Sequence, residues 1–349
     1  MRKHYIDNLR TIMILLLFPV HTFMIWNNYG AKFYVWNGEN RLLSSLIIIV
    51  NPWFMALLFV IAGMCAKYSL ENRGIKKFIK ERFSKLFLPF SFGIILLIPI
   101  QTLYARKFFF NYQGSIFSNY KYFFTHFTDL SGYDGSFTPG HLWFILFLFI
   151  ISLLSLIVLK YIPYKKIVSK FEKLNLLEII LLFIPVWLFY YIGNFGGYSI
   201  GKYFILYLFG YYIFSNEKII DKIIESKMII LGLFSFVQLV LIIAYYKFSY
   251  YGDFLVNLVG WLGILSCLII GKCYLNRETK ITKYFSSASF SIYILHQPIL
   301  IILGYYILDI IDNLFLQVSI IILGSFIITL FFYEILKRIP YLKKIFGIK

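Results

Sequence analysis

Charged residues are scarce in this sequence. Asp, Glu, Lys and Arg make up 14% of the 349 residues and hydrophobic residues make up 60%, whereas a soluble domain carries about 25% charged residues. The shortage of charge argues against a water-soluble fold. Apolar runs of about 20 residues recur along the chain, which is the length of helix that crosses a bilayer. The composition therefore predicts an all-α, polytopic membrane protein built as a helical bundle.

Cysteines and familiar catalytic motifs are also scarce. Cys65, Cys267 and Cys273 lie in or next to apolar runs, and their number and spacing predict neither a disulfide framework nor a zinc site. The chain has no Walker A loop, no GxSxG or HExxH motif and no Cys/His cluster. We expect no bound metal. If the protein is an enzyme, these absences favour direct transfer assisted by a base over a covalent intermediate on the protein.

Ten apolar segments predict ten membrane-spanning helices within a single domain, residues 1–349. They cover about residues 11–29, 42–66, 86–104, 142–159, 176–192, 203–214, 228–246, 254–271, 287–308 and 314–333. The first segment lacks a small-residue cleavage site, so we interpret it as a retained helix rather than a signal peptide. The sixth is short, and the glycines beside it, Gly196, Gly197 and Gly201, allow the entering chain to bend.

The net charge is +18, and its distribution predicts the orientation of the chain. With ten spans, 27 of the 34 Lys and Arg residues fall on the side of the two termini. Seven fall on the opposite side: Lys32, Arg41, Arg106, Lys107, Lys121, Lys202 and Lys247. Because positive residues are enriched in cytoplasmic loops, both termini are predicted to be cytoplasmic. The positive charge is then a topology signal and a contact for lipid headgroups, not a nucleic-acid site.

His21 is an ionisable residue within the first span, and such residues are costly and by default functional. Arg10 lies eleven residues earlier, a separation of about three helical turns, and Asp7 is close to the same helix face. Histidine suits general acid–base chemistry near neutral pH, and arginine binds anionic oxygens. The alternatives are a histidine that hydrogen-bonds a neighbouring helix and a simple Asp7–Arg10 ion pair, which is the favoured role for Asp7.

Arg82 and Lys85 share a helix face before the third span and are candidates to bind the phosphates of an anionic donor. The loop they end, residues 67–85, holds seven positive and two negative residues. Ordinary enrichment of positive charge in a cytoplasmic loop explains most of these residues. Arg82 and Lys85 are singled out because they lie nearest the membrane entrance.

Two further histidines stand in informative contexts. His141 and Trp143 follow a Pro-Gly pair at the end of the long outside loop 106–140, where they either anchor the membrane rim or bind a sugar against aromatic faces. His296 lies inside the ninth span, two residues before Pro298, which frees a backbone carbonyl. His21 and His296 are predicted at similar depth and could meet in one cavity. A packing hydrogen bond is an equal alternative.

Several segments resemble those of the membrane acyltransferase-3 family, which includes O-acetyltransferases of bacterial surface polysaccharides and glucan succinyltransferases. Residues 5–10 (YIDNLR) and His21 match its pattern of arginine or lysine, ten residues, then histidine. Residues 59–63 (FVIAG) resemble its FFxISG stretch, with Ala62 where serine is usual. Residues 82–85 (RFSK) resemble its basic pair, with Lys85 where arginine is common. Residues 140–144 (GHLWF) and 291–296 (SIYILH) resemble its GHLWF and FSxYLLH segments.

The resemblance implies an integral enzyme of the bacterial cell membrane that moves an acetyl or succinyl group from cytoplasmic acyl-CoA to a hydroxyl of an extracytoplasmic glycan. The implied site residues are, for catalysis, His21 as general base with Arg10 and Asp7; for the donor, Arg10, Arg82 and Lys85; and for the acceptor, His141, Trp143 and His296. Glycan-synthesis machinery is an expected partner.

Two rival hypotheses use the same charged cavity without chemistry. One is a transporter or flippase of an anionic or lipid-linked glycan, and the other is a non-catalytic subunit of a polysaccharide-synthesis machine. Many transporters have matching halves with interrupted helices. The sequence shows no convincing pair of such halves, which favours the enzyme.

Overall fold

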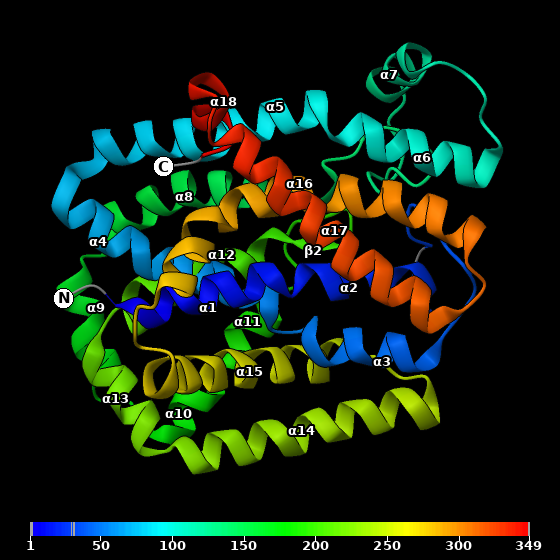
Figure 1. The fold of residues 1–349 in the computed structure, drawn as a ribbon. Coiled ribbons are helices and arrows are strands. Elements are labelled where there is room, and N and C mark those ends of the chain that lie inside the picture. Colours follow the sequence, from blue (N-terminus) through cyan, green and yellow to red (C-terminus); the bar gives the residue numbers. More distant parts are fainter. Residues whose placement is uncertain (1–2, 29, 31, 348–349) are drawn as a thin grey trace. The chain divides into compact units, whose positions relative to one another are not determined.

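The structure is a computed structural model that describes residues 3–28, 30 and 32–347 (Figure 1). These residues are almost entirely helical, and the sheet among them has just two antiparallel strands, β1 (Asn194–Phe195) and β2 (Tyr198–Ser199). This confirms the prediction of an all-α fold. Arg2, Tyr29 and Lys349, which entered the charge and span predictions, lie outside the described residues.

The chain divides into two compact units, formed by residues 1–13, 48–83 and 147–279 and by residues 14–47, 84–146 and 280–349. The helices of the first unit are α4 (Phe54–Arg82), α9 (Tyr164–Phe171), α10 (Leu176–Leu181), α11 (Phe183–Phe189), α12 (Ile200–Phe209), η4 (Gly210–Phe214), α13 (Glu217–Glu225), α14 (Lys227–Phe248) and α15 (Asp253–Tyr274). Those of the second are α2 (Leu17–Phe23), η1 (Met24–Trp26), α5 (Leu88–Leu96), α6 (Ile98–Phe110), α7 (Ile116–Thr125), η3 (Gly140–Leu142), α16 (Lys280–Ile310), α17 (Leu314–Leu336) and α18 (Pro340–Ile345). Helices with residues in both units are α1 (His4–Leu15), α3 (Arg41–Val50), η2 (Phe83–Phe87) and α8 (Trp143–Tyr161). The single domain over residues 1–349 stays a prediction.

Seven stretches of the described residues are long and apolar enough to cross a membrane. They are His4–Trp26, Arg41–Phe110, Gly140–Tyr161, Lys227–Phe248, Asp253–Tyr274, Lys280–Ile310 and Leu314–Leu336. The second stretch is 70 residues long and contains two of the predicted spans, and two shorter apolar stretches, Leu176–Phe189 and Ile200–Phe214, coincide with predicted spans five and six. Helix length and composition thus indicate an integral membrane protein. The count of ten spans and the cytoplasmic termini stay predictions.

Prolines explain where the apolar helices break. A proline has no N–H to donate to the carbonyl four residues before it, and its ring crowds that carbonyl. The break between α1 and α2 falls at Leu16, three residues before Pro19, and the break between α10 and α11 falls at Leu182, three residues before Pro185. Leu16 itself keeps helical φ and ψ values of −64° and −17°, so His4–Trp26 stays one helical stretch. The shared face of its charged residues rests on the sequence alone.

Two glycines allow α4 and the α12–η4 segment of the first unit to pack backbone against backbone. A Cβ atom on Gly63 would lie 2.0 Å from the carbonyl oxygen of Tyr207, and one on Gly210 would lie 2.0 Å from that of Val60. No side chain fits at such distances, so both positions need glycine. Close approach at small residues is a principal source of helix association in membranes.

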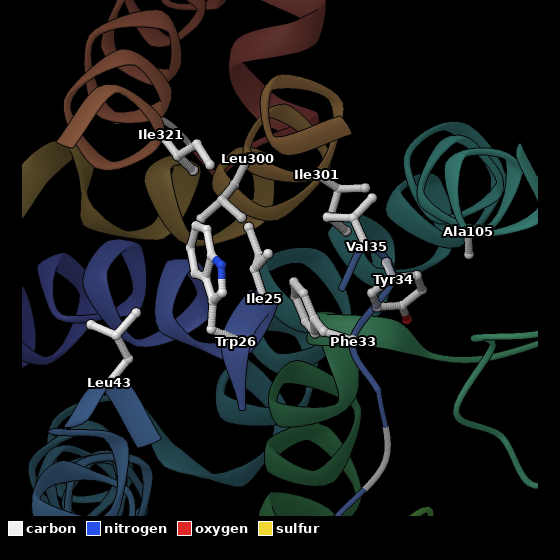
Figure 2. Close-up of a cluster of buried hydrophobic side chains, with 10 residues drawn as sticks. All are labelled: Ile25, Trp26, Phe33, Tyr34, Val35, Leu43, Ala105, Leu300, Ile301 and Ile321. Atoms are coloured by element: carbon white, nitrogen blue, oxygen red, sulfur yellow. The ribbon is translucent and has the colours of Figure 1, made fainter. Parts of the chain in front are cut away.

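The second unit has a hydrophobic core to which α16, α17, α6, α3, η1 and the loop residues 33–35 contribute (Figure 2). Its buried members are Ile25, Trp26, Phe33, Tyr34, Val35, Leu43, Ala105, Leu300, Ile301 and Ile321. Ile25 lies one turn after His21, and Leu300 lies one turn after His296. Packing of this core therefore fixes the helices that carry both histidines.

Replacement of Gly63 by alanine is expected to lower the free energy of unfolding by about 3 kcal/mol, because the added methyl group meets a backbone carbonyl that cannot yield. Thermal unfolding in detergent micelles measures the effect. Gly232→Ala in α14 is the matched control, since a Cβ there meets nothing within 4 Å and alanine favours a helix. Equal melting temperatures for the two variants would contradict the close packing of α4 on α12.

Candidate functional site

Three histidines come together in the second unit. His21 lies in α2, His141 in η3 and His296 in α16. The ring centroid of His296 is 5.3 Å from that of His21 and 5.2 Å from that of His141. His141 and His296 are buried and His21 is half-buried. The expected meeting of His21 and His296 is therefore observed, and His141 joins them.

A tight turn directs His141 into the unit. Gly140 has a φ of 51°, which residues with a side chain rarely adopt, and a Cβ there would lie 2.8 Å from Ile98 Cδ1. The turn begins η3, and Nε2 of His141 lies 2.9 Å from the carbonyl oxygen of Ile294. Because a carbonyl oxygen accepts only, Nε2 of His141 carries the proton.

Pro298 explains why the Ile294 carbonyl is available. Pro298 lies inside α16 and has no N–H for the carbonyl four residues before it, which is that of Ile294. His141 supplies the missing donor, so the carbonyl that the sequence predicted Pro298 to free is bound by a predicted site residue. The Tyr293 hydroxyl in turn donates to the carbonyl oxygen of His141. Two hydrogen bonds thus join α16 to η3.

A chain of side-chain amides continues from His141. Since its Nε2 is protonated, Nδ1 of the neutral ring accepts, and the Gln101 amide donates to it over 3.0 Å. Nε2 of Gln297 donates to Oε1 of Gln101 over 3.0 Å. Both glutamines are buried. With both ring nitrogens bound inside the protein, His141 is arranged to hold the structure around the site rather than to act as a base.

His296 is arranged differently. Its Nδ1 lies 2.7 Å from the carbonyl oxygen of Tyr293, so Nδ1 carries the proton and Nε2 keeps a lone pair. This Nε2 is buried without a hydrogen-bond partner, and so is Oε1 of Gln297. Buried polar atoms almost always have partners, and polar residues inside a membrane span are costly. Because His296 lies next to His21, these two acceptors are candidates to meet a ligand.

His21 also departs from the rule that buried polar atoms have hydrogen-bond partners. Its Nδ1 is buried without a hydrogen-bond partner. The ring stacks on Phe33, with centroids 5.9 Å apart and planes 14° from parallel. Phe18 lies edge-on to His296, with centroids 5.8 Å apart. The two imidazoles thus stand among aromatic rings, and each has a buried nitrogen without a partner.

The first unit holds the charged candidates. Arg10 Nη2 lies 2.8 Å from Asp7 Oδ1, so the ion pair considered as the alternative role of Asp7 is present. Arg10, Asp7 and Arg82 all lie within electrostatic reach of the Cys65 thiol. Arg82 stands over the ring of Phe78 at 4.4 Å, and its Nε is buried without a hydrogen-bond partner. Arg10 and Arg82 therefore both lie near Cys65.

The other two candidates lie apart from the histidines' hydrogen bonds. Lys85 is an exposed residue of η2 within the second unit. Trp143 is 6% exposed and packs edge-on to Phe144, with centroids 6.3 Å apart, which favours packing over sugar stacking. The most exposed aromatic rings of loop 106–140 are instead those of Phe117 and Phe127, which are 82% and 64% exposed. Within the described residues, no group of three or more His, Cys, Asp or Glu is placed to hold a metal ion.

The sequence did not identify Gln101 and Gln297 as residues of the site. Both are uncharged amides in apolar helices, and a search for ionisable residues passes over them. The requirement that a polar side chain in a span find a partner would have singled them out. The pairing itself has no sequence signal, because it joins residues 196 positions apart.

Comparison with known proteins identifies the family of this chain. A family model described as an acyltransferase domain matches residues 3–334, so the chain belongs to the membrane acyltransferase-3 family. The protein is an acyltransferase, as the resemblance of its motifs implied. It is similar to glucans biosynthesis protein C of Salmonella gallinarum (strain 287/91 / NCTC 13346), with 24% identity over 392 aligned positions that cover 99% of this chain and 94% of that protein. No solved structure matches the chain.

His141→Leu is expected to lower the free energy of unfolding by about 2–4 kcal/mol, because it leaves the Gln101 amide and the Ile294 carbonyl without partners. Thermal unfolding measures the loss. His126→Leu serves as the control, since His126 is an exposed histidine of loop 106–140 and surface substitutions cost about 0.5 kcal/mol or less. A His141→Leu protein as stable as the control would show that the hydrogen-bonded chain does not hold the unit together.

Proposed function

We propose that this protein transfers an acyl group from acyl-CoA on the cytoplasmic side of the bacterial cell membrane to a hydroxyl of a glycan outside, with His21 as general base. Family membership supports acyl transfer as the reaction. The observation that carries the site assignment is the pair of adjacent histidines, His21 and His296, whose inward nitrogens are buried and unpartnered. A neutral imidazole inside a span can accept the proton of a hydroxyl, and ionisable residues there are costly and by default functional.

The reaction needs one base and no protein nucleophile. The hydroxyl oxygen of the acceptor forms a bond to the thioester carbonyl carbon while its proton moves to a ring nitrogen of His21. The carbon–sulfur bond then breaks, and the same proton passes from His21 to the sulfur of coenzyme A. The products are an ester and free thiol, so atoms and charge balance without a metal or a covalent enzyme intermediate. Aromatic walls such as Phe33 exclude water, which limits thioester hydrolysis.

The donor is assigned to the basic residues that the sequence predicts at the cytoplasmic edge. Arg82 is the strongest candidate, because its Nε is buried without a partner and can form a charge-assisted bond to phosphate. Arg10 is close by but engaged with Asp7, so it contributes charge more than a free donor. Lys85, exposed at the third predicted span, adds a further positive charge. In this arrangement Asp7 orients Arg10 and takes no part in proton transfer.

The acceptor is proposed to be a glucan or a related surface glycan. The name of the similar Salmonella protein points to glucan biosynthesis. Exposed aromatic rings of loop 106–140 suit the apolar faces of sugars. His141 directly follows this loop in the chain and bonds the carbonyl of Ile294, two residues before His296. Acetyl and succinyl groups both fit this chemistry. Glycan-synthesis machinery is a natural partner because it would deliver the acceptor.

His21→Ala is expected to reduce acyl transfer by about 1,000-fold, since the reaction loses its general base. Purified protein with acetyl-CoA or succinyl-CoA and a glucan oligosaccharide provides the assay, and mass spectrometry detects the acylated sugar. His4→Ala is the control, because His4 is a half-exposed histidine beside Glu278 at the start of α1. Undiminished transfer by the folded His21→Ala protein would remove His21 from the mechanism.

Arg82→Gln is expected to raise the KM for acyl-CoA by about 10- to 100-fold with a smaller effect on kcat, because one charge-assisted bond to phosphate is lost. Arg73→Gln is the matched control, since Arg73 lies just before the kink at Gly74 of α4, is exposed and already pairs with Glu81. The comparison is made with steady-state kinetics at fixed ionic strength. If both variants had the same KM for acyl-CoA, Arg82 would not bind the donor.

A further inference from the structure

The adjacent rings of His21 and His296 each have one buried nitrogen without a hydrogen-bond partner. Two imidazoles joined by an N–H···N hydrogen bond of about 3 Å have ring centroids about 5 Å apart. The centroids of His21 and His296 are 5.3 Å apart, with the planes tilted by 32°. The distance between the rings therefore permits a hydrogen bond between Nδ1 of His21 and Nε2 of His296. Such a bond would give a partner to two buried atoms that otherwise have none.

The backbone decides the direction of that bond. Nδ1 of His296 donates to the Tyr293 carbonyl, so Nε2 of the neutral ring can only accept. The proton between the rings must therefore belong to His21 Nδ1. The lone pair of His21 is then on Nε2. Because His21 is half-buried while its Nδ1 is fully buried, Nε2 is the nitrogen left for a substrate to meet.

We infer that His296 is the positioning residue for His21: its Nε2 accepts the Nδ1–H of His21, fixes the tautomer with a basic Nε2, and stabilises the imidazolium formed when His21 takes the acceptor's proton. The inference rests on the proposed function, and it changes the role first expected for His296, which was to bind the acceptor. The complete sequence of hydrogen bonds runs from acceptor hydroxyl to His21, His296 and the Tyr293 carbonyl. No proton leaves His296 in this scheme.

The surroundings fit a positioning role. Phe18 and Tyr293 rings flank His296, which is fully buried, so its ring has little freedom to turn. His141, the other histidine beside it, has both nitrogens bound and cannot compete for His21. A fixed acceptor behind a histidine base has the same logic as the orienting carboxylate of a hydrolase triad. Here a second, neutral histidine takes that place, which avoids burying a negative charge in the membrane.

Two substitutions of His296 separate positioning from packing. His296→Gln can present its amide oxygen near the place of Nε2, whereas His296→Leu fills a similar space without an acceptor. We expect His296→Leu to lower kcat by about 100- to 1,000-fold with little change in KM for either substrate, and His296→Gln to stay within about 10-fold of the wild type. Melting temperatures establish that both variants fold. Equal losses in the two folded variants, or wild-type kcat in His296→Leu, would overturn the inference.

A second readout does not depend on turnover. Nitrogen-15 NMR of histidine-labelled protein distinguishes the two neutral tautomers, and His21→Ala assigns the signal of His21. The wild type should show His21 protonated at Nδ1, and His296→Leu should show a mixture. The Nε2–H tautomer in the wild type would overturn the inference even if the enzyme is active. A wild-type protein that transfers no acyl group from acyl-CoA would instead overturn the proposed function.

Discussion

Every polar group placed inside a bilayer needs a partner, because the surrounding hydrocarbon supplies none. In the second unit this constraint is most visible at Pro298, whose missing N–H leaves the Ile294 carbonyl without its helical donor. The bond from His141 satisfies that carbonyl, and the order of the amides follows from it: His141 must be protonated at Nε2, so Gln101 must donate to it, and Gln297 must donate to Gln101. One proline thus sets the direction of three hydrogen bonds.

Against this background the exceptions become informative. Where the chain of bonds ends, His21, His296 and Gln297 each keep a buried atom without a partner. What distinguishes the atoms of His21 and His296 is that the two rings are adjacent, so we infer that these atoms serve another molecule or each other. The same pattern occurs in the first unit, where Arg82 has a buried unpartnered Nε while Arg10 is paired with Asp7. The argument for function rests on these contrasts between neighbouring residues.

The sequence was a good guide to what depends on composition and local chemistry. Apolar runs predicted the helices, and an ionisable residue in a span singled out His21 and His296, which the structure brings together. It was a poor guide to what depends on tertiary contacts. The different tasks of His141 and His296 follow from which carbonyl each ring meets. No periodicity or motif carries that information.

The central claim is acyl transfer from one face of the membrane to the other. An experiment that supplies the donor and the acceptor on opposite faces tests it most directly. Protein reconstituted in vesicles receives isotope-labelled acyl-CoA on the face of the chain's termini and a membrane-impermeant glucan on the opposite face, and the orientation of the protein is fixed by protease protection of the termini. The account predicts label esterified to the glucan with release of free coenzyme A on the donor face. Label that appears only on glucan supplied to the same face as acyl-CoA, or no acylated glucan with either acetyl-CoA or succinyl-CoA, would contradict it.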